Sequence, residues 1–234
     1  MKALRVAAGI VNAICLLLFA LYFSVQLPTF SLWFYEREFE KNGTYAQVNM
    51  EAEDLHAVTA HMIRYMRGAE DELNIETTVG GQTRLFFSER EIFHMEDVRL
   101  LFDGGRMIRN VSAMLFLLTG AFLFWQKRAG RTAALQCWRA VAFGLLGAFV
   151  VLSGIVAVSF NRAFTLFHEI FFNNDLWLLD ARVDLLVNIV PTPFFIDIAL
   201  FIGIVFAGIL FLMGTFAAAM LRGRGDEAGI RREE

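Results

Sequence analysis

Four long apolar stretches constrain the fold of this chain more than any other feature. A helix needs roughly 20 mostly apolar residues to cross the hydrocarbon core of a bilayer. Four segments have this character, namely 1–27, 107–125, 138–160 and 194–221. The composition agrees, because 57% of the 234 residues are hydrophobic, whereas soluble domains contain about 45–50%. The sequence therefore predicts an α-helical membrane protein built as a four-transmembrane-helix bundle.

The distribution of basic residues predicts the orientation of the four spans. The loop 126–137 carries Lys127, Arg128 and Arg131 and no acidic residue, which is typical of a cytoplasmic loop. Both termini, including the tail 222–234, are then cytoplasmic, and the segments 28–106 and 161–193 face outward. The first stretch is too long for the apolar part of a signal peptide, so we expect it to be retained. The sequence has no basic stripe with interleaved aromatic residues, so we expect no nucleic-acid partner.

The outward segment 28–106 predicts a small α+β extracytoplasmic subdomain between spans one and two. Apolar residues recur at helical spacing before Gly68, and a β-hairpin is expected around Gly80–Gly81. Ser88 and Glu91 have the spacing of a capping box and predict the start of another helix. Gly104–Gly105 would permit a sharp bend of the chain before span two.

The predicted helix after Ser88 contains the first candidate site residue, His94. Glu91 and Asp97 lie one helical turn before and after it, so a carboxylate flanks the imidazole on either side. A nearby carboxylate orients an imidazole ring and supports its charged form. The competing interpretation is an exposed helix held by salt bridges.

His168 follows span three, beside a stripe of phenylalanines on a helix that we expect to continue out of that span. Four aspartates follow it, and Asp197 lies about one turn inside span four, where an ionisable side chain indicates a functional site. The outward edge thus collects two histidines and several candidate supporting carboxylates, which are Glu91, Asp97, Asp175, Asp180, Asp184 and Asp197.

The residues leave three interpretations of this edge open. It is a catalytic site of histidines and carboxylates, a site for a divalent metal ion, or a polar network with a structural role. No compact metal-binding motif is present, so we expect no metal ligands. His56 and His61 are five residues apart and do not share a helix face as a metal-binding pair would, and we expect them to be ordinary surface histidines.

Three runs of sequence resemble a known family. They are "REIFHMEDVRLLF", "NNDLWLLDARVD" and "VPTPFFIDIA". They are similar to the family of four-span bacterial membrane proteins that includes the lipoprotein intramolecular transacylases, and the resemblance extends from the first span to the fourth. It implies an acyltransferase of the bacterial cytoplasmic membrane whose active site faces outward. The substrate would be a diacylglyceryl lipoprotein, whose sn-2 acyl chain moves to the α-amine of its N-terminal cysteine.

The resemblance also implies that His94 and His168 are catalytic. We expect His94 to accept the proton of the α-amine and His168 to orient the ester or return a proton to the leaving oxygen. Intramolecular transfer requires no cofactor. A groove open to membrane lipid would hold an acyl chain, with candidate walls Phe164, Phe167, Phe171, Phe194 and Phe195. No oligomeric state follows from the sequence.

The alternative function is non-catalytic: a membrane scaffold or lipid-binding protein with a structural polar network. The distance between His94 and His168 discriminates between the two. Histidines close enough to share one substrate centre favour catalysis, and histidines on opposite sides of the bundle favour a scaffold.

Overall fold

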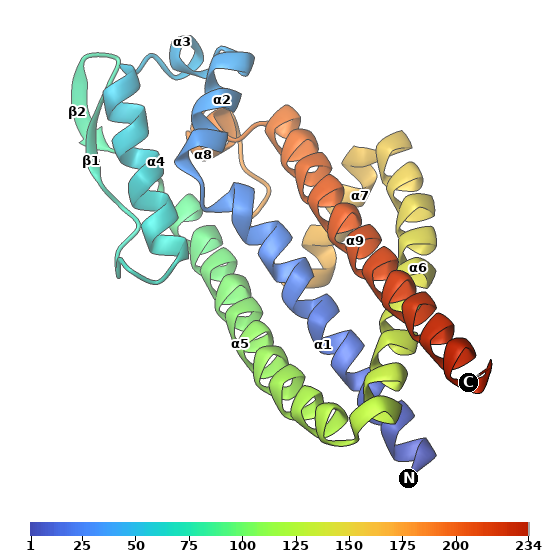
Figure 1. The fold of residues 1–234 in the computed structure, drawn as a ribbon. Helices are drawn as coiled ribbons and strands as arrows, with labels where there is room; N and C mark the ends of the chain where they lie inside the picture. The colour runs from blue at the N-terminus through green and yellow to red at the C-terminus, as the bar shows by residue number, and fades with distance from the viewer. Residues whose placement is uncertain (234) are drawn as a thin grey trace. The chain divides into compact units, whose positions relative to one another are not determined.

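The computed structural model describes residues 1–233, apart from the side chains at positions 155, 157 and 224–233. Figure 1 shows long helices, several short ones and one small antiparallel sheet. In chain order the elements are α1 (Lys2–Thr29), α2 (Leu32–Asn42), α3 (Thr44–Val48), α4 (Ala52–Met66), β1 (Glu76–Val79), β2 (Gln82–Leu85), α5 (Glu89–Trp125), α6 (Lys127–Val158), α7 (Phe160–Phe171), α8 (Leu186–Ile189) and α9 (Thr192–Glu233).

Among the described residues, four helical segments are long and apolar enough to cross a membrane. They are Lys2–Thr29, Glu89–Trp125, Lys127–Gly154 and Thr192–Gly223. Within the protein, no more than 33% of the most apolar part of any of them is buried. Apolar helices that lack protein cover to this extent are suited to lipid. The predicted four-span helical membrane architecture is confirmed.

The chain forms two compact units. The first contains Met1–Ser24, Met107–Ala157 and Gly203–Glu234, and the second contains Val25–Arg106 and Val158–Ile202. Most of each apolar span belongs to the first unit. Both candidate histidines belong to the second unit.

A buried asparagine joins three helices of the first unit. Asn12 of α1 is 2% exposed. Its Nδ2 donates to the carbonyl oxygen of Phe116 and to Thr119 Oγ1 of α5, both at 2.9 Å, and its Oδ1 accepts from Trp138 Nε1 of α6 at 3.0 Å. A polar side chain with partners on two other helices stabilises helix association in lipid.

The second unit has an aromatic core. Phe34, Phe39 and Phe86 are each at most 1% exposed. Phe34 and Phe39 belong to α2, and Phe86 directly follows β2. The predicted helix before Gly68 is α4, and its expected apolar face is buried as Leu55, Val58, Met62 and Met66. Gly68 has a φ of 76°, which ends the helix in the left-handed conformation that glycine adopts without strain.

The predicted β-hairpin is also confirmed. Strands β1 and β2 pair antiparallel, with Val79 opposite Gln82. Gly80 and Gly81 between them have φ values of 59° and 79°. Two successive positive φ values are the requirement of a type I′ turn, whose twist matches that of the flanking strands.

Two predictions about helix boundaries are wrong. The helix α5 runs through Gly104–Gly105 without a break, so the sharp bend expected before span two is absent. Of its residues we take 107–125 as membrane-spanning, because charged side chains occur on every turn of 89–106. Conversely, the helix of span three does not continue to His168: α6 ends at Val158, and α7 begins at Phe160.

The outward segment 161–193 contains most of α7 and all of α8, so the helix expected around His168 is present as α7. Ser159 between α6 and α7 has φ −140° and ψ 52°, outside the helical region. Of the tail 222–234, the side chains beyond Gly223 lie outside the described residues.

Candidate active site

The structure brings His94 and His168 together. His94 lies in the second turn of α5, and His168 lies near the end of α7. Their ring centroids are 6.1 Å apart, with 32° between the ring planes. The two residues are 8% and 7% exposed. Two buried imidazoles at this separation are close enough to contact one substrate centre, which favours the catalytic interpretation over the scaffold.

The position of His94 depends on the capping box that begins α5. The backbone N–H of Ser88 donates to Glu91 Oε2 at 2.6 Å, and the backbone N–H of Glu91 donates to Ser88 Oγ at 3.3 Å. Glu91 Oε1 accepts a further hydrogen bond from the backbone N–H of Leu186 in α8. Glu91 is fully buried, so it fixes the start of α5, and its carboxylate points to the cap rather than to the imidazole.

His168 is held in one tautomer. Its Nδ1 lies 2.8 Å from the carbonyl oxygen of Phe164, one turn earlier in α7. Because a carbonyl oxygen only accepts hydrogen bonds, Nδ1 carries the hydrogen. In the neutral ring the lone pair is therefore on Nε2. Trp177 packs on this ring with a centroid distance of 4.7 Å and a 32° tilt, which holds the ring plane.

Asn174 connects the two histidine segments. Its Nδ2 donates to Asp97 Oδ2 at 2.8 Å, and Asp97 lies one turn after His94 on α5. Its Oδ1 accepts from the backbone N–H of Leu176 at 3.1 Å, and its carbonyl oxygen accepts from Trp177 Nε1 at 3.0 Å. One residue thus holds α5 through Asp97 and holds the ring that packs on His168.

Asp97 does not orient His94 as the sequence suggested, because its carboxylate accepts from Asn174 instead. Within the part of the chain that the structure describes, His94 Nδ1 is buried without a hydrogen-bond partner. A buried polar atom left in this state costs roughly 1–3 kcal/mol.

Both imidazoles are neutral at physiological pH. Burial, reinforced by the nearby His168, lowers the pKa of His94 to about 4, although the charge of Asp97 acts in the opposite direction. Burial also lowers the pKa of His168, although its hydrogen bond to Phe164 opposes the shift. A neutral imidazole has a lone pair for an incoming proton and an N–H to donate, so the pair offers both functions at once.

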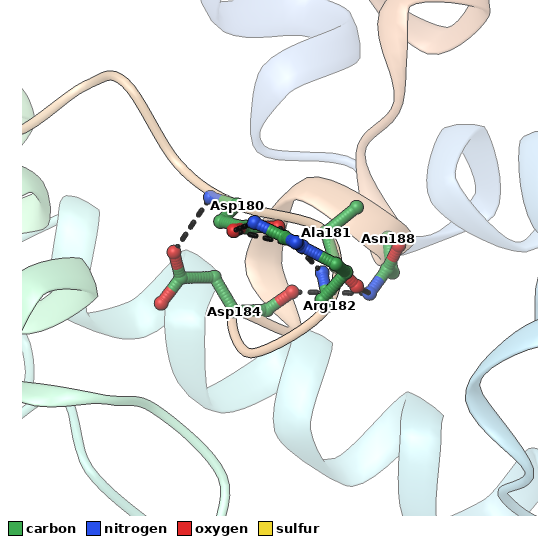
Figure 2. Close-up of polar contacts among 5 residues, drawn as sticks. All are labelled: Asp180, Ala181, Arg182, Asp184 and Asn188. Atoms are coloured by element: carbon green, nitrogen blue, oxygen red, sulfur yellow. Dashed lines mark hydrogen bonds and ion pairs between the residues drawn. The ribbon is translucent and has the colours of Figure 1, made fainter.

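Asp180 and Asp184 build a polar corner together with Ala181, Arg182 and Asn188 (Figure 2). Asp184 is 3% exposed and accepts from Ser88 Oγ at 2.9 Å and from the backbone N–H of Asp180 at 2.8 Å. Asp180 forms an ion pair with Arg182, and this hydrogen bonding lowers the pKa of Asp180 to about 2. The corner therefore supports the cap of α5, and neither aspartate contacts a histidine.

Asp175 and Asp197 also have other partners than the histidines. The Asp175 side chain is 80% exposed and lies 3.8 Å from Arg90 Nη2. Asp197 in α9 forms an ion pair with Lys41 of α2, beside Glu38, which is 1% exposed. Burial, followed by a hydrogen bond with Asp197, raises the pKa of Glu38. Sequence patterns did not indicate Glu38 or Lys41, because this contact joins segments far apart in the chain.

The candidate groove residues divide into two groups. Phe164 packs on His168 at 4.3 Å and on Phe195 at 5.0 Å between ring centroids. Phe167 and Phe171 stack on each other and remain 43% and 53% exposed. Phe194 instead is 2% exposed and packs on Phe34 and Tyr35, so it belongs to the core.

The other two histidines lie apart from this pair. His56 Nε2 is 2.8 Å from Tyr45 Oη, and His61 Nε2 is 2.9 Å from the carbonyl oxygen of Glu72. Across the described residues, no group of three or more His, Cys, Asp or Glu side chains is arranged to hold a metal ion.

The family model that describes the lipoprotein intramolecular transacylase Lit matches residues 10–195. The chain belongs to the Lit family. The structure of the membrane integral Lit from Bacillus cereus is similar over 96% of this chain and 99% of that one, with a TM-score of 0.79 and 16% sequence identity. A histidine-to-alanine variant of that protein is similar over 95% and 96% of the two chains, with a TM-score of 0.73 and 16% identity. At this identity the likeness shows that the Lit fold is shared.

A protein of Aquifex aeolicus without an assigned function is a further relative of this Lit-family chain. The two are 30% identical over 143 residues, which is 59% of this chain and 61% of the relative. The chain thus matches less than two thirds of the length of that relative. The match by the Lit family model is longer and establishes the family.

Proposed function

We propose that the protein is a lipoprotein intramolecular transacylase of the bacterial cytoplasmic membrane. It moves the sn-2 acyl chain of a diacylglyceryl lipoprotein to the α-amine of the N-terminal cysteine and leaves an N-acyl lyso-lipoprotein. The observation that carries this proposal is the buried pair of neutral imidazoles 6.1 Å apart in a chain of the Lit family. The reaction is an acyl transfer between two positions of one substrate molecule.

The tautomer of His168 supports its assignment as the general base. The sequence had led us to expect this role for His94. His168 Nε2 has the lone pair and accepts the proton of the α-amine as the amine nitrogen attacks the ester carbonyl carbon. His94 stays neutral and donates its N–H to the oxyanion of the tetrahedral intermediate. When the bond from carbon to the sn-2 oxygen breaks, the His168 imidazolium returns the proton to that oxygen. The proton lost by nitrogen thus ends on oxygen, and no other reactant is consumed.

Proximity supplies much of the rate enhancement. Ester and amine belong to the same lipid-modified cysteine, so binding has only to align them. The exposed faces of Phe167 and Phe171 extend from the histidine pair and provide an apolar wall for an acyl chain. Phe167 also contacts the His168 ring directly, with 5.5 Å between centroids, and Phe164 and Phe195 continue the aromatic surface on that histidine.

The orientation follows from charge. The basic loop 126–137 and both termini lie in the cytoplasm, and the second unit faces outward. The histidines then work at the outer leaflet, where the acyl chains and the cysteine of an exported lipoprotein are found.

The alternative of a non-catalytic scaffold accounts for the corner around Asp184 but not for the histidines. The carboxylate of Asp184 has two hydrogen bonds and belongs to the cap of α5, whereas a scaffold has no need of two buried imidazoles 6.1 Å apart.

The decisive experiment uses purified protein in lipid with a synthetic diacylglyceryl lipopeptide that has a free N-terminal cysteine. Substrate and product are isomers, so their masses are equal. We expect time-dependent loss of amine-reactive labelling, and fragment ions that place the acyl chain on nitrogen. An analogue with an sn-2 ether should not react, and a protein with both histidines replaced by alanine should be inactive. Release of free fatty acid, or no acyl migration, would contradict the proposal.

A further inference from the structure

A cavity in the first unit differs from the histidine site in the composition and charge of its lining. It has a volume of about 590 Å³ and is lined by Arg139, Phe143, Thr215, Ala218, Ala219, Leu221 and Arg222. The lining residues come from α6 and α9 alone. Arg139 lies at the start of the apolar stretch 138–160, and Arg222 directly follows the stretch 194–221, so both guanidinium groups mark the same end of two spans.

Small residues on α9 make room for this cavity. Phe143 of α6 packs directly on Gly214, where an added Cβ would lie 2.9 Å from the ring. One and two turns later, Ala218 and Leu221 continue the wall, and the short side chains of Ala218 and Ala219 leave the space open. The lining therefore combines apolar side chains with the two arginines.

The two arginines give the described lining of the cavity a positive charge. No acidic side chain is among the described lining residues, and no hydrogen bond or ion pair joins Arg139 or Arg222 to any side chain that the structure describes. Both side chains are exposed. The Thr215 hydroxyl donates to the carbonyl oxygens of Phe211 and Leu212, so the arginines are the available donors.

We propose that this cavity binds the phosphate of an anionic phospholipid from the leaflet at the basic end of the spans. Guanidinium groups match phosphate oxygens with paired hydrogen bonds, and basic pockets between spans on the cytoplasmic side recognise anionic headgroups. The apolar lining around Phe143 takes the start of an acyl chain, which a soluble anion lacks. The site depends on membrane insertion and not on the transacylase reaction.

The test is a competition between lipids. Protein in a neutral detergent is mixed with equimolar phosphatidylglycerol and phosphatidylcholine, and native mass spectrometry measures which lipid stays bound. We expect wild-type protein to retain phosphatidylglycerol preferentially. Each arginine should contribute about fivefold, so Arg139→Gln/Arg222→Gln should lose most of the preference.

Two further variants separate the cavity from general surface charge. Ala218→Phe fills the cavity while keeping both arginines, and it should also lose the preference. Arg5→Gln removes a positive charge outside the cavity, and this variant should keep the preference for phosphatidylglycerol. Excess inorganic phosphate should displace little lipid. Equal retention of both lipids by wild-type protein, an unchanged preference in Ala218→Phe, or full displacement by phosphate would each overturn the proposal.

Discussion

In the proposed mechanism, the lone pair on His168 Nε2 and the Nδ1 of His94, which has no hydrogen-bond partner among the described residues, assign different tasks to two residues of one type. His168→Ala and His94→Ala should each lower the transacylation rate by roughly 10²–10⁴-fold. His94→Asn retains an N–H donor and should recover part of the rate, whereas His168→Asn lacks a base and should not. His56→Ala and His61→Ala serve as matched controls and should stay near wild type. Recovery by His168→Asn rather than His94→Asn would reverse the assignment.

The depressed pKa of His94 makes folding stability depend on pH. Its pKa is about 4 in the folded protein and near 6.5 in an unfolded chain. Between these values the unfolded chain binds a proton that the folded protein does not bind. Stability is therefore complete above about pH 6.5 and falls as the pH decreases toward 4.

His94→Leu removes this titration and allows a direct test. At pH 5 the wild-type histidine should cost about 2 kcal/mol relative to pH 7.5. Unfolding in detergent is measured for both proteins at both pH values. The variant should gain stability relative to wild type on acidification. A stability difference independent of pH would show that the folded pKa of His94 is normal.

Asn174 positions the histidines through Asp97 and Trp177, and an exchange of donor and acceptor tests this role. Asn174→Asp places two carboxylates together and should lower the catalytic rate by at least tenfold. Adding Asp97→Asn restores one donor and one acceptor, so the double variant should regain most of the rate. Turnover and thermal stability are measured together. Loss of activity in the double variant, with normal stability, would contradict the positioning role.

Some of these residue roles follow from sequence and some do not. The capping box of Ser88 and Glu91 depends on residues three apart and was correctly predicted. The helical spacing of Asp97 from His94 was also correct, but the partner of Asp97 was not. Asn174 comes from a distant segment of the chain. Its hydrogen bond to Asp97 could not be predicted, because only the fold brings the two residues together.

At the scale of elements, the start of α5 determines where His94 lies. Glu91→Ala would leave the backbone N–H groups of Ser88 and Leu186 without acceptors in a buried setting. Loss of the two bonds should destabilise the protein by roughly 2–4 kcal/mol. Glu89→Ala changes an exposed carboxylate in the same turn and should have little effect. Thermal unfolding of both variants checks this prediction, and equal midpoints would contradict it.

Helix boundaries show why local signals are incomplete. Gly104–Gly105 has low helix propensity, yet α5 continues through it, because contacts over a long helix outweigh about 1 kcal/mol per glycine. At Ser159 the opposite occurs: the helix breaks between α6 and α7, although no glycine or proline is present there to indicate a break. The helix face that carries the phenylalanine stripe was nevertheless readable from its helical period, because all members of the stripe lie within α7, after the break.

At the scale of the whole molecule, the proposed topology places 28–106 outside and 126–137 inside. Thr83→Cys and Arg131→Cys, each in a Cys15→Ala/Cys137→Ala background, should react with an impermeant thiol reagent from opposite sides of the membrane. Arg131 is preferable to Gly130, because a side chain at Gly130 would collide with the carbonyl oxygen of Leu123. Labelling of both positions from the same side in intact cells would reject the topology.

The number of spans was predictable, because each depends on a continuous apolar run. The two-unit organisation was not, because each unit combines segments from distant parts of the chain. The pairing of Lys41 with Asp197 and the meeting of His94 with His168 are consequences of that organisation. Sequence placed both histidines at one edge but did not determine that their rings would be neighbours.

The neutrality of the histidine pair has a consequence for selectivity against the surrounding bilayer. Ordinary phospholipids also carry an sn-2 ester and vastly outnumber any lipoprotein, yet an enzyme that consumed them would damage its own membrane. Their distinguishing group is a phosphate, and two uncharged imidazoles beside Asp97 provide no cation to hold one. In the proposed reaction a lipoprotein presents an amine instead, which meets the lone pair on His168 Nε2. Protection of the bilayer would then rest on the absence of positive charge from these two rings.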